Sequence, residues 1–118
     1  MYEKMDREMP VQDFIQGLEP KKQAKISREI DLLEKFGSEL HYPHVDTIKG
    51  DKYKGLLELR VEFASNIFRI FFFLPKKNNA ILLHGIAKKS QKTPQKELDV
   101  AFGRMKDYSR RRRKNGME

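Results

Sequence analysis

Five cationic or titratable side chains interrupt three strand-like segments that are otherwise mostly apolar, between residues 56 and 89. They are Arg60, Arg69, His84, Lys88 and Lys89. Arginine and lysine bind phosphate strongly, and histidine transfers protons near neutral pH. Cleaving RNA without a metal requires deprotonation of the 2′-hydroxyl, stabilisation of the charge on the phosphorane and protonation of the departing 5′ oxygen. These residue types therefore predict an RNA-cleaving site that works without a metal.

Each of these residues suits one part of that reaction. Arg60 and Arg69 suit charge stabilisation, because a guanidinium stays protonated and binds phosphate through two N–H groups. Lys88 or Lys89 could act as the base, because neighbouring cations favour the uncharged amine. His84 could act as either acid or base. The residue pattern leaves the assignment of base and acid open.

The sequence does not favour a metal or cofactor site. The chain contains no cysteine, which excludes a disulfide, a thiolate zinc site and a cysteine nucleophile. A metal-dependent nuclease needs converging carboxylates, and only Glu58 and Glu62 lie in the predicted strands. In the segment 41–44, a proline between two histidines breaks the helix that would align them as ligands. We therefore expect no metal and no cofactor.

Hydrophobic periodicity predicts the elements that position these residues. Apolar residues recur at helical spacing after Pro10 and again after Pro20, and Gly37 ends the second run. The predicted elements are helices at 11–18 and 20–36, strands at 56–63, 67–74 and 80–89, and a helix that begins near Thr93 and Pro94 and runs to 108. The sequence therefore predicts an α+β fold, in which an N-terminal helical hairpin packs on a small antiparallel sheet of three to four strands with a C-terminal helix.

Hairpin geometry decides whether the cationic residues share one face of that sheet, because a shift of one residue moves a side chain to the other face. Two-residue turns at Ser65-Asn66 and at Asn78-Asn79 would place all the strand cations on one side. This register puts Arg60 opposite Phe71, Arg69 opposite Glu62 and Lys88, and His84 opposite Phe73.

Two interpretations of such a face remain open. Cations that lie directly opposite one another are destabilising unless an anion sits between them, and a bound phosphate would supply that anion. The structural alternative is that Glu62 neutralises Arg69, while Lys88 extends into solvent at a strand end.

The length of the chain limits the number of domains, and its net charge indicates the class of binding partner. The 118 residues suffice for one ordinary domain, which we expect at 1–109, followed by a basic flexible tail at 110–118. The formal net charge of +8 indicates a polyanionic partner, either nucleic acid or an acidic protein. No apolar run approaches the roughly 18 residues of a membrane span, and the polar start lacks the apolar region of a signal peptide. We expect a soluble, cytoplasmic protein without a membrane partner.

Three segments carry a resemblance to a known family: Leu57-Glu58-Leu59-Arg60, Phe68-Arg69-Ile70, and the stretch 82–94 with its Lys-Lys-x-x-Lys-Thr-Pro pattern. Over residues 10–108, the chain resembles the phage Gp49-like, HigB-type branch of the RelE/ParE toxin superfamily. The resemblance implies a RelE-like fold and the toxin of a type II toxin–antitoxin system, most often a metal-independent, ribosome-dependent mRNA endonuclease that inhibits translation. The implied partners are the ribosome, mRNA and a helix-turn-helix antitoxin, with which the toxin would form a hetero-oligomer.

The resemblance also implies roles for individual residues that match the family's pattern. It implies catalytic roles for Arg60, Arg69, Lys88 and Lys89, with His84 at a matching position, and RNA binding by Tyr53, Lys54 and Lys92. Related chains commonly begin with a β-strand, whereas residues 1–9 are short and charged. We therefore expect that first strand to be reduced or absent.

Two other function classes fit the same composition. One is a ParE-like toxin that blocks a protein target such as gyrase without catalysis. The other is a basic RNA-binding module, for which the loss of one cation would weaken binding modestly and lower the salt slope by about one unit. Cleavage of mRNA on translating ribosomes separates the enzyme from both.

Overall fold

The described part of the chain folds into three helices, a four-stranded sheet and two short 3-10 turns. The computed structural model describes residues 1–5, 7–41, 44–48, 50–77, 79–88 and 93–114. The elements are α1 (Pro10–Gln16), α2 (Pro20–Phe36), η1 (Gly37–Glu39), β1 (Val45–Thr47), η2 (Asp51–Tyr53), β2 (Leu57–Phe63), β3 (Asn66–Lys76), β4 (Asn79–Lys88) and α3 (Gln95–Lys114). The predicted α+β class is confirmed. The added strand, β1, lies between the predicted helix at 20–36 and the predicted strand at 56–63, where the sequence analysis places no element.

The two N-terminal helices begin where proline permits and end where glycine permits. Pro10 and Pro20 occupy the first turns of α1 and α2, where a missing backbone N–H leaves no hydrogen bond unmade. Gly37 follows α2 with a φ of 53°, a left-handed conformation that residues with a side chain rarely adopt. Between these ends, α2 buries Ile26 and Leu33 against the sheet.

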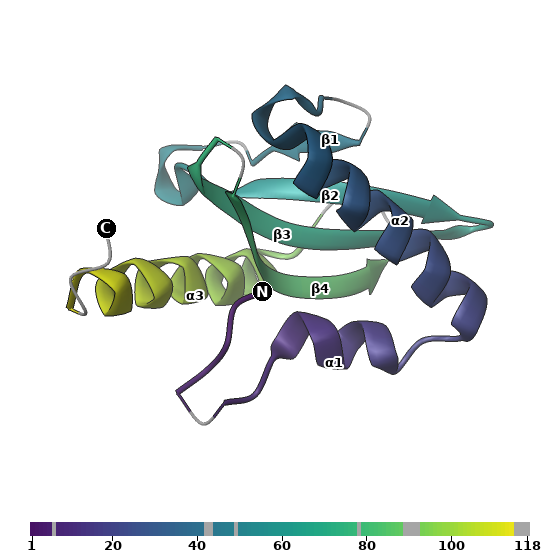
Figure 1. Cartoon of the computed structure of the whole chain (residues 1–118), viewed down its shortest axis with the longest axis horizontal. Coiled ribbons are helices and arrows are strands. Elements are labelled where there is room, and N and C mark those ends of the chain that lie inside the picture. Colours follow the sequence, from purple (N-terminus) through teal and green to yellow (C-terminus); the bar gives the residue numbers. More distant parts are fainter. Residues whose placement is uncertain (6, 42–43, 49, 78, 89–92, 115–118) are drawn as a thin grey trace.

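The strands form one antiparallel sheet in the order β1-β2-β3-β4 (Figure 1). Phe63 pairs with Asn66, so the β2–β3 turn is Ala64-Ser65 and the predicted turn at Ser65-Asn66 is wrong. Ala64 takes a φ of 56° in this turn. Local propensity misplaced the turn because Asn and Ser are the usual turn formers.

The strand pairs accordingly differ from the predicted register. Arg60 lies opposite Arg69 rather than Phe71, Glu62 and Lys88 each lie opposite Ile67 rather than Arg69, and His84 lies opposite Phe71 rather than Phe73. Each pair is displaced by two positions. A displacement of two keeps every side chain on its face, because the side-chain period of a strand is two.

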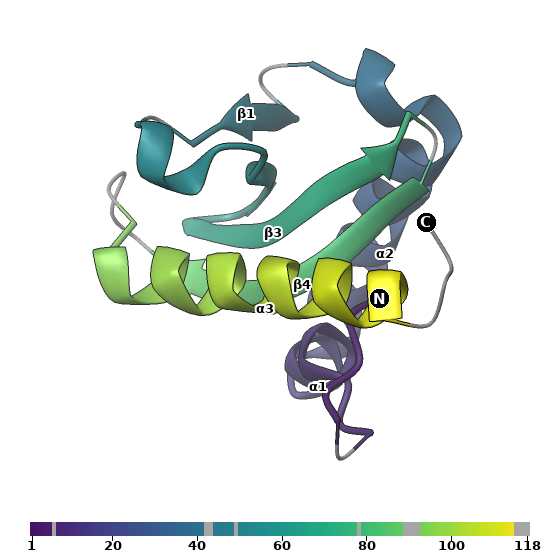
Figure 2. The ribbon, with the colours of Figure 1, turned by 90° about the vertical axis from the view of Figure 1, so that its left-hand side faces the viewer.

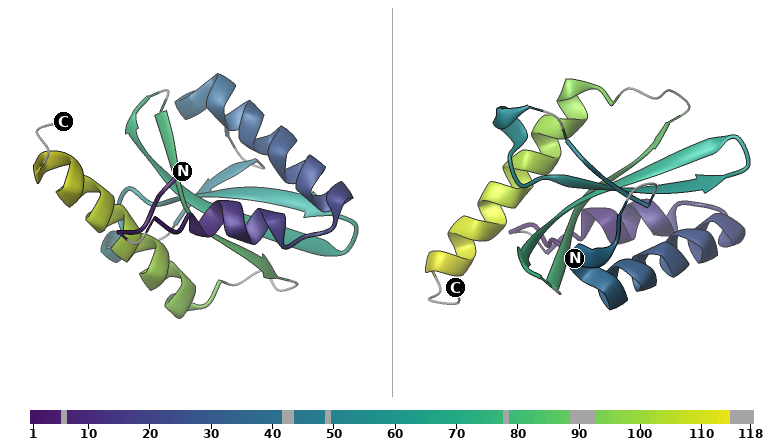
Figure 3. Two further views of the ribbon diagram at one scale, coloured as in Figure 1. Left: turned by 60° about the horizontal axis from the view of Figure 1, so that its bottom comes forward. Right: turned by 90° about the horizontal axis from the view of Figure 1, so that it is seen from above.

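The sheet is covered on both faces, which gives three layers (Figures 1 and 3). One core joins α1 and α2 to the sheet through side chains such as Leu59, Phe68 and Phe72. The other core joins α3 to the opposite face through Phe71 and Leu83. The cationic strand residues alternate with the first set and therefore lie on the α3 side.

Helix α3 crosses this second face and continues to Lys114 (Figure 2). Residues 110–114, which the sequence assigns to a flexible tail, thus belong to the helix, and residues 115–118 lie outside the described part of the chain. The run of arginines at this end favours the helix, because cations stabilise the negative end of the helix dipole.

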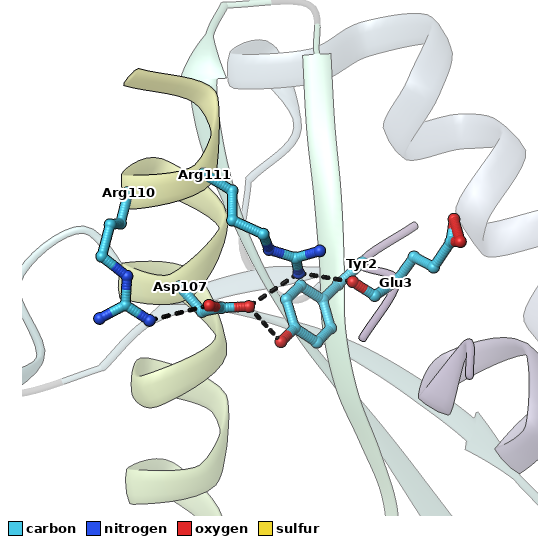
Figure 4. Close-up of polar contacts among 5 residues, drawn as sticks. All are labelled: Tyr2, Glu3, Asp107, Arg110 and Arg111. Atoms are coloured by element: carbon cyan, nitrogen blue, oxygen red, sulfur yellow. Dashed lines mark hydrogen bonds and ion pairs between the residues drawn. The ribbon is translucent and has the colours of Figure 1, made fainter. Parts of the chain in front are cut away.

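The N-terminal segment ties α3 to the sheet (Figure 4). Tyr2 N donates a hydrogen bond to Leu82 O in β4 at 2.7 Å, and the Tyr2 hydroxyl donates to Asp107 Oδ2 in α3 at 2.7 Å. Arg111, also in α3, donates a hydrogen bond to the backbone oxygen of Glu3. Residues 1–5 and 7–9 contain no strand, so in this described part of the segment the implied first strand is replaced by a strap of a few hydrogen bonds.

Candidate functional site

Strand register gathers the cationic residues on the sheet face that α3 covers. Arg60 lies opposite Arg69, Arg69 lies opposite Ile86, and His84 lies opposite Phe71. Phe71 and Ile86 belong to the core beneath α3. The predicted shared face of Arg60, Arg69 and His84 is therefore confirmed, although their cross-strand partners are not the predicted ones.

A buried carboxylate lies between the two arginines. Arg69 Nη1 donates a hydrogen bond to Glu58 Oε2 at 2.7 Å, and Arg60 Nε lies 3.9 Å from the same oxygen. Arg69 and Glu58 are each only 4% exposed. Glu58 thus supplies the counter-charge that the structural interpretation of the sequence assigned to Glu62, which is exposed at the sheet edge.

The Glu58 carboxylate removes the argument that the two opposed arginines, Arg60 and Arg69, need a bound phosphate. The carboxylate offsets the repulsion between the guanidinium groups, so the sheet requires no bound phosphate for its stability. Burial raises the pKa of Glu58, and the nearby Arg69 and Arg60 charges oppose that rise. With Glu58 ionised, two guanidinium groups and one carboxylate leave a net charge of +1. Arg60 exposes 13% of its side chain against 5% for Arg69, so Arg60 is the more accessible of the two arginines.

His84 is held between two residues of α3. Arg104 Nη1 lies 3.1 Å from His84 Nδ1, and His84 Nε2 lies 3.2 Å from Glu97 Oε1. Because a guanidinium can only donate, Nδ1 must accept and Nε2 must carry the proton toward Glu97. Burial lowers the pKa of His84, with the Arg104 charge acting in the same direction and Glu97 against it. The ring also stacks on Phe71, with centroids 6.2 Å apart. In this state His84 is a neutral ring that joins β4 to α3.

The basic segment before β2 is anchored to α3 by Tyr53. The Tyr53 ring is buried edge-on against Phe102, and its hydroxyl donates to Asp99 Oδ1 at 2.6 Å. Lys52 Nζ lies 3.4 Å from the same oxygen, whereas Lys54 is exposed. The Tyr53 ring is therefore part of the core, and Lys54 presents its charge to solvent beside it.

Arg60 also lines a shallow hollow of about 190 Å³ at the edge of the sheet, with Lys25, Glu29, His44 and Glu62. Glu29 is buried and lies 3.0 Å from His44 Nδ1 and 3.9 Å from Lys25 Nζ. Arg60 Nε has no hydrogen-bond partner, so the guanidinium is not fully engaged by Glu58. The lining of the hollow carries two cations, Lys25 and Arg60, and two carboxylates, Glu29 and Glu62, so its formal charges balance, and Arg60 is the cation of the sheet that borders it.

A family model matches the chain over most of its length. The model for phage-derived Gp49-like proteins, "Phage derived protein Gp49-like (DUF891)", covers residues 13–106. The chain belongs to this family. The Gp49-like family is related to RelE/ParE-type toxins, and toxins of that kind generally pair with an antitoxin. No curated protein and no solved structure matches the chain.

Part of the predicted site of this Gp49-like protein lies outside the described residues. Lys89 and Lys92 lie outside the described part of the chain. Lys88 is described only by its position in β4, opposite Ile67. Among the residues that are described, no three His, Asp or Glu side chains are grouped so that they could hold a metal ion. No helix in the described ranges has both the length and the apolar character needed to cross a membrane.

Sequence reasoning missed three side chains of this Gp49-like protein that contact the predicted site residues Arg69 and His84. They are Glu58, Glu97 and Arg104. Glu58 carried a usable signal, because it shares the alternating face of Arg60 in the strand sequence. Glu97 and Arg104 are seven residues apart and therefore lie on one face of a helix. That spacing would identify them as a pair, but it does not indicate that His84 lies between them.

Proposed function

We propose that this Gp49-like protein is the toxin of a type II toxin–antitoxin system and acts as a metal-independent, ribosome-dependent mRNA endonuclease. The main support is the family's relation to RelE/ParE-type toxins, combined with a sheet face that carries Arg60, Arg69 and His84. The net charge of +8 suits a polyanionic substrate. The proposed partners are ribosome-bound mRNA and a helix-turn-helix antitoxin that forms a hetero-oligomer with the toxin.

In this proposal the two arginines have different roles. Arg60 binds the reacting phosphate and stabilises the charge on the phosphorane, because its guanidinium borders the open hollow. Arg69 is a positioning residue, since it is buried and its hydrogen bond fixes the Glu58 carboxylate beside Arg60. Glu58 in turn restricts where the Arg60 guanidinium can point.

Proton transfer is assigned to the end of β4. Lys88 and Lys89 are the proposed candidates for the base, and Lys54 and Lys92 are proposed to hold flanking phosphates, with Tyr53 positioning the segment that carries Lys54. His84 transfers a proton only after Glu97 or Arg104 moves away from its ring, because both ring nitrogens are engaged. A reaction in which α3 stays in place therefore depends on the lysines.

The test is primer extension on mRNA bound to translating ribosomes, with purified wild-type protein and single variants. Arg60→Gln is expected to lower the cleavage rate by about 10²–10³-fold, the usual effect of removing one group that stabilises a transition-state charge. Lys88→Gln or Lys89→Gln should lower it by about 10²–10⁴-fold if the residue is the base. Arg28→Gln, which removes an exposed cation of α2, is the matched control and should cleave normally. Intact message with the wild-type protein would refute the proposal.

One observation favours a second candidate function, a non-enzymatic toxin that blocks a protein such as gyrase. Arg69 and His84, two of the five predicted catalytic residues, are engaged in contacts within the fold. Inhibition of DNA supercoiling by the wild-type protein, without cleavage of ribosome-bound mRNA, would support this candidate over the endonuclease. A pure RNA-binding module would show neither effect.

A further inference from the structure

A second cationic site is lined by residues of the C-terminal turns of α3 and of the β3–β4 hairpin. Figure 2 shows how these two segments of the ribbon are arranged. The site is a hollow of about 250 Å³ whose lining includes Lys76, Arg112 and Arg113, together with the apolar surfaces of Pro75 and Tyr108. Arg69 and Lys76 are seven positions apart on β3, which corresponds to roughly 20 Å. The hollow is therefore separate from the candidate site at Arg60.

Among the described residues, the lining of this hollow contains no carboxylate, and Asn79 and Ser109 complete it. The nearest acidic group of the helix, Asp107, is already paired with Arg110 at 2.9 Å and Arg111 at 2.7 Å. Arg111 also reaches the N-terminal segment at Glu3 O, whereas Arg110 contacts Asp107 from the outer side of α3 (Figure 4). Arg112, Arg113 and Lys76 thus concentrate positive charge around the hollow, and no carboxylate in the described part of its lining compensates that charge.

The geometry of the hollow favours a phosphodiester over a simple counter-ion. Arg112 Nη1 donates to the Tyr108 hydroxyl at 3.2 Å and its guanidinium lies 5.5 Å from the centre of that ring, which holds the charge in a fixed place. The Tyr108 ring packs edge-on against Phe73 and cannot move freely. A guanidinium held next to an apolar wall, as that of Arg112 is, matches a phosphate with its attached sugar.

The stabilising effect of cations at a helix C-terminus explains part of this charge, but not its placement. Lys76 belongs to the hairpin and not to the helix, so the dipole of α3 does not account for it. A helix-stabilising role would also be met by Arg110 and Arg111 alone.

We propose that this C-terminal basic hollow binds the phosphodiester backbone of a nucleic acid strand, at a second position outside the candidate site. The inference does not depend on catalysis and holds for any of the functions considered above. Binding rests on phosphates, so RNA and DNA of the same length should both bind, with little dependence on base sequence.

The experiment measures the affinity of the full chain for a fluorescein-labelled 20-nucleotide oligouridylate, by anisotropy, over a series of NaCl concentrations. The test variant is Lys76→Gln/Arg112→Gln/Arg113→Gln, because glutamine keeps the helix propensity of α3 close to that of arginine. The control variant is Lys21→Gln/Arg28→Gln/Lys35→Gln, which removes three exposed cations of α2 and the same net charge.

Losing three phosphate contacts should make the salt slope about two units shallower, at about 0.7 per contact for a single strand, and weaken binding about tenfold at low salt. The control should change the slope by less than one unit. Wild-type affinity in the test variant, or an equal loss in both variants, would overturn the proposal. Displacement of the oligonucleotide by polyglutamate of equal charge at equal concentration would also overturn it, in favour of an acidic protein partner. If the triple variant does not fold, Lys76→Gln alone decides the question, with an expected slope change of about 0.7.

Discussion

Replacing Arg69 with methionine tests whether the buried ion pair stabilises the sheet. The side chains are 5% exposed for Arg69 and 6% exposed for Glu58, so water screens the pair little. The substitution retains apolar volume but leaves the Glu58 carboxylate with Arg60, 3.9 Å away, as its ion-pair partner. Removing one member of a buried pair destabilises a protein by about 3–5 kcal/mol. For a domain of this size we expect Tm to fall by roughly 10–20 °C.

The size of this loss depends on pH through Glu58. Burial raises the pKa of Glu58, and Arg69 is the largest of the influences that lower it, so the substitution raises the pKa further. A carboxyl with a raised folded-state pKa contributes stability that is fully present below its unfolded pKa and is lost as the pH rises through its folded pKa. The gap between variant and wild type should therefore be small below about pH 4 and should widen toward neutral pH.

Urea unfolding followed by circular dichroism at several pH values measures both effects. The double variant Arg69→Met/Glu58→Gln is the control, because it removes the buried carboxylate together with its partner. It should recover at least half of the stability that the single variant loses at pH 7. A loss of less than about 1 kcal/mol in the single variant would refute the reasoning. A double variant that is no more stable than the single one would refute it equally.

Four further substitutions test other contacts. Burial lowers the pKa of His84, so the wild-type protein should lose stability as the pH falls through the window below about 6.5, and His84→Gln should flatten that fall in urea titrations at pH 5 and 8. Gly85→Ala places a Cβ 2.6 Å from Phe14 Cδ2 and should destabilise by about 1–3 kcal/mol in thermal unfolding. Gly103→Ala meets nothing within 4 Å in α3 and should stabilise by about 0.5–1 kcal/mol, so equal effects of the two alanines would contradict the packing. Tyr2→Phe removes a hydrogen bond to α3 and should lower stability by about 1 kcal/mol, and an unchanged Tm would show that the strap does not hold the helix.

The sequence by itself determined the two N-terminal helices, three of the four strands of the described sheet, most of the C-terminal helix and the face on which the cationic residues lie. Proline at 10 and 20 and glycine at 37 mark helix ends through restrictions on the local backbone, and the alternation in 57–63 marks a strand. Arg60 and Arg69 were predicted to share a face although the turn was misplaced. The prediction held because the error was an even number of residues, which leaves side-chain direction unchanged.

Only the tertiary structure decided which charges are compensated. Glu58 of β2 reaches Arg69 on the neighbouring strand β3, and Glu97 and Arg104 reach His84 when α3 packs on the sheet. Local periodicity reports the direction of a side chain but not the residue that it meets, because that residue comes from a segment whose position depends on the packing of the whole fold. The electrostatics of the site are therefore set by long-range contacts, even though most of its cations can be recognised in the sequence.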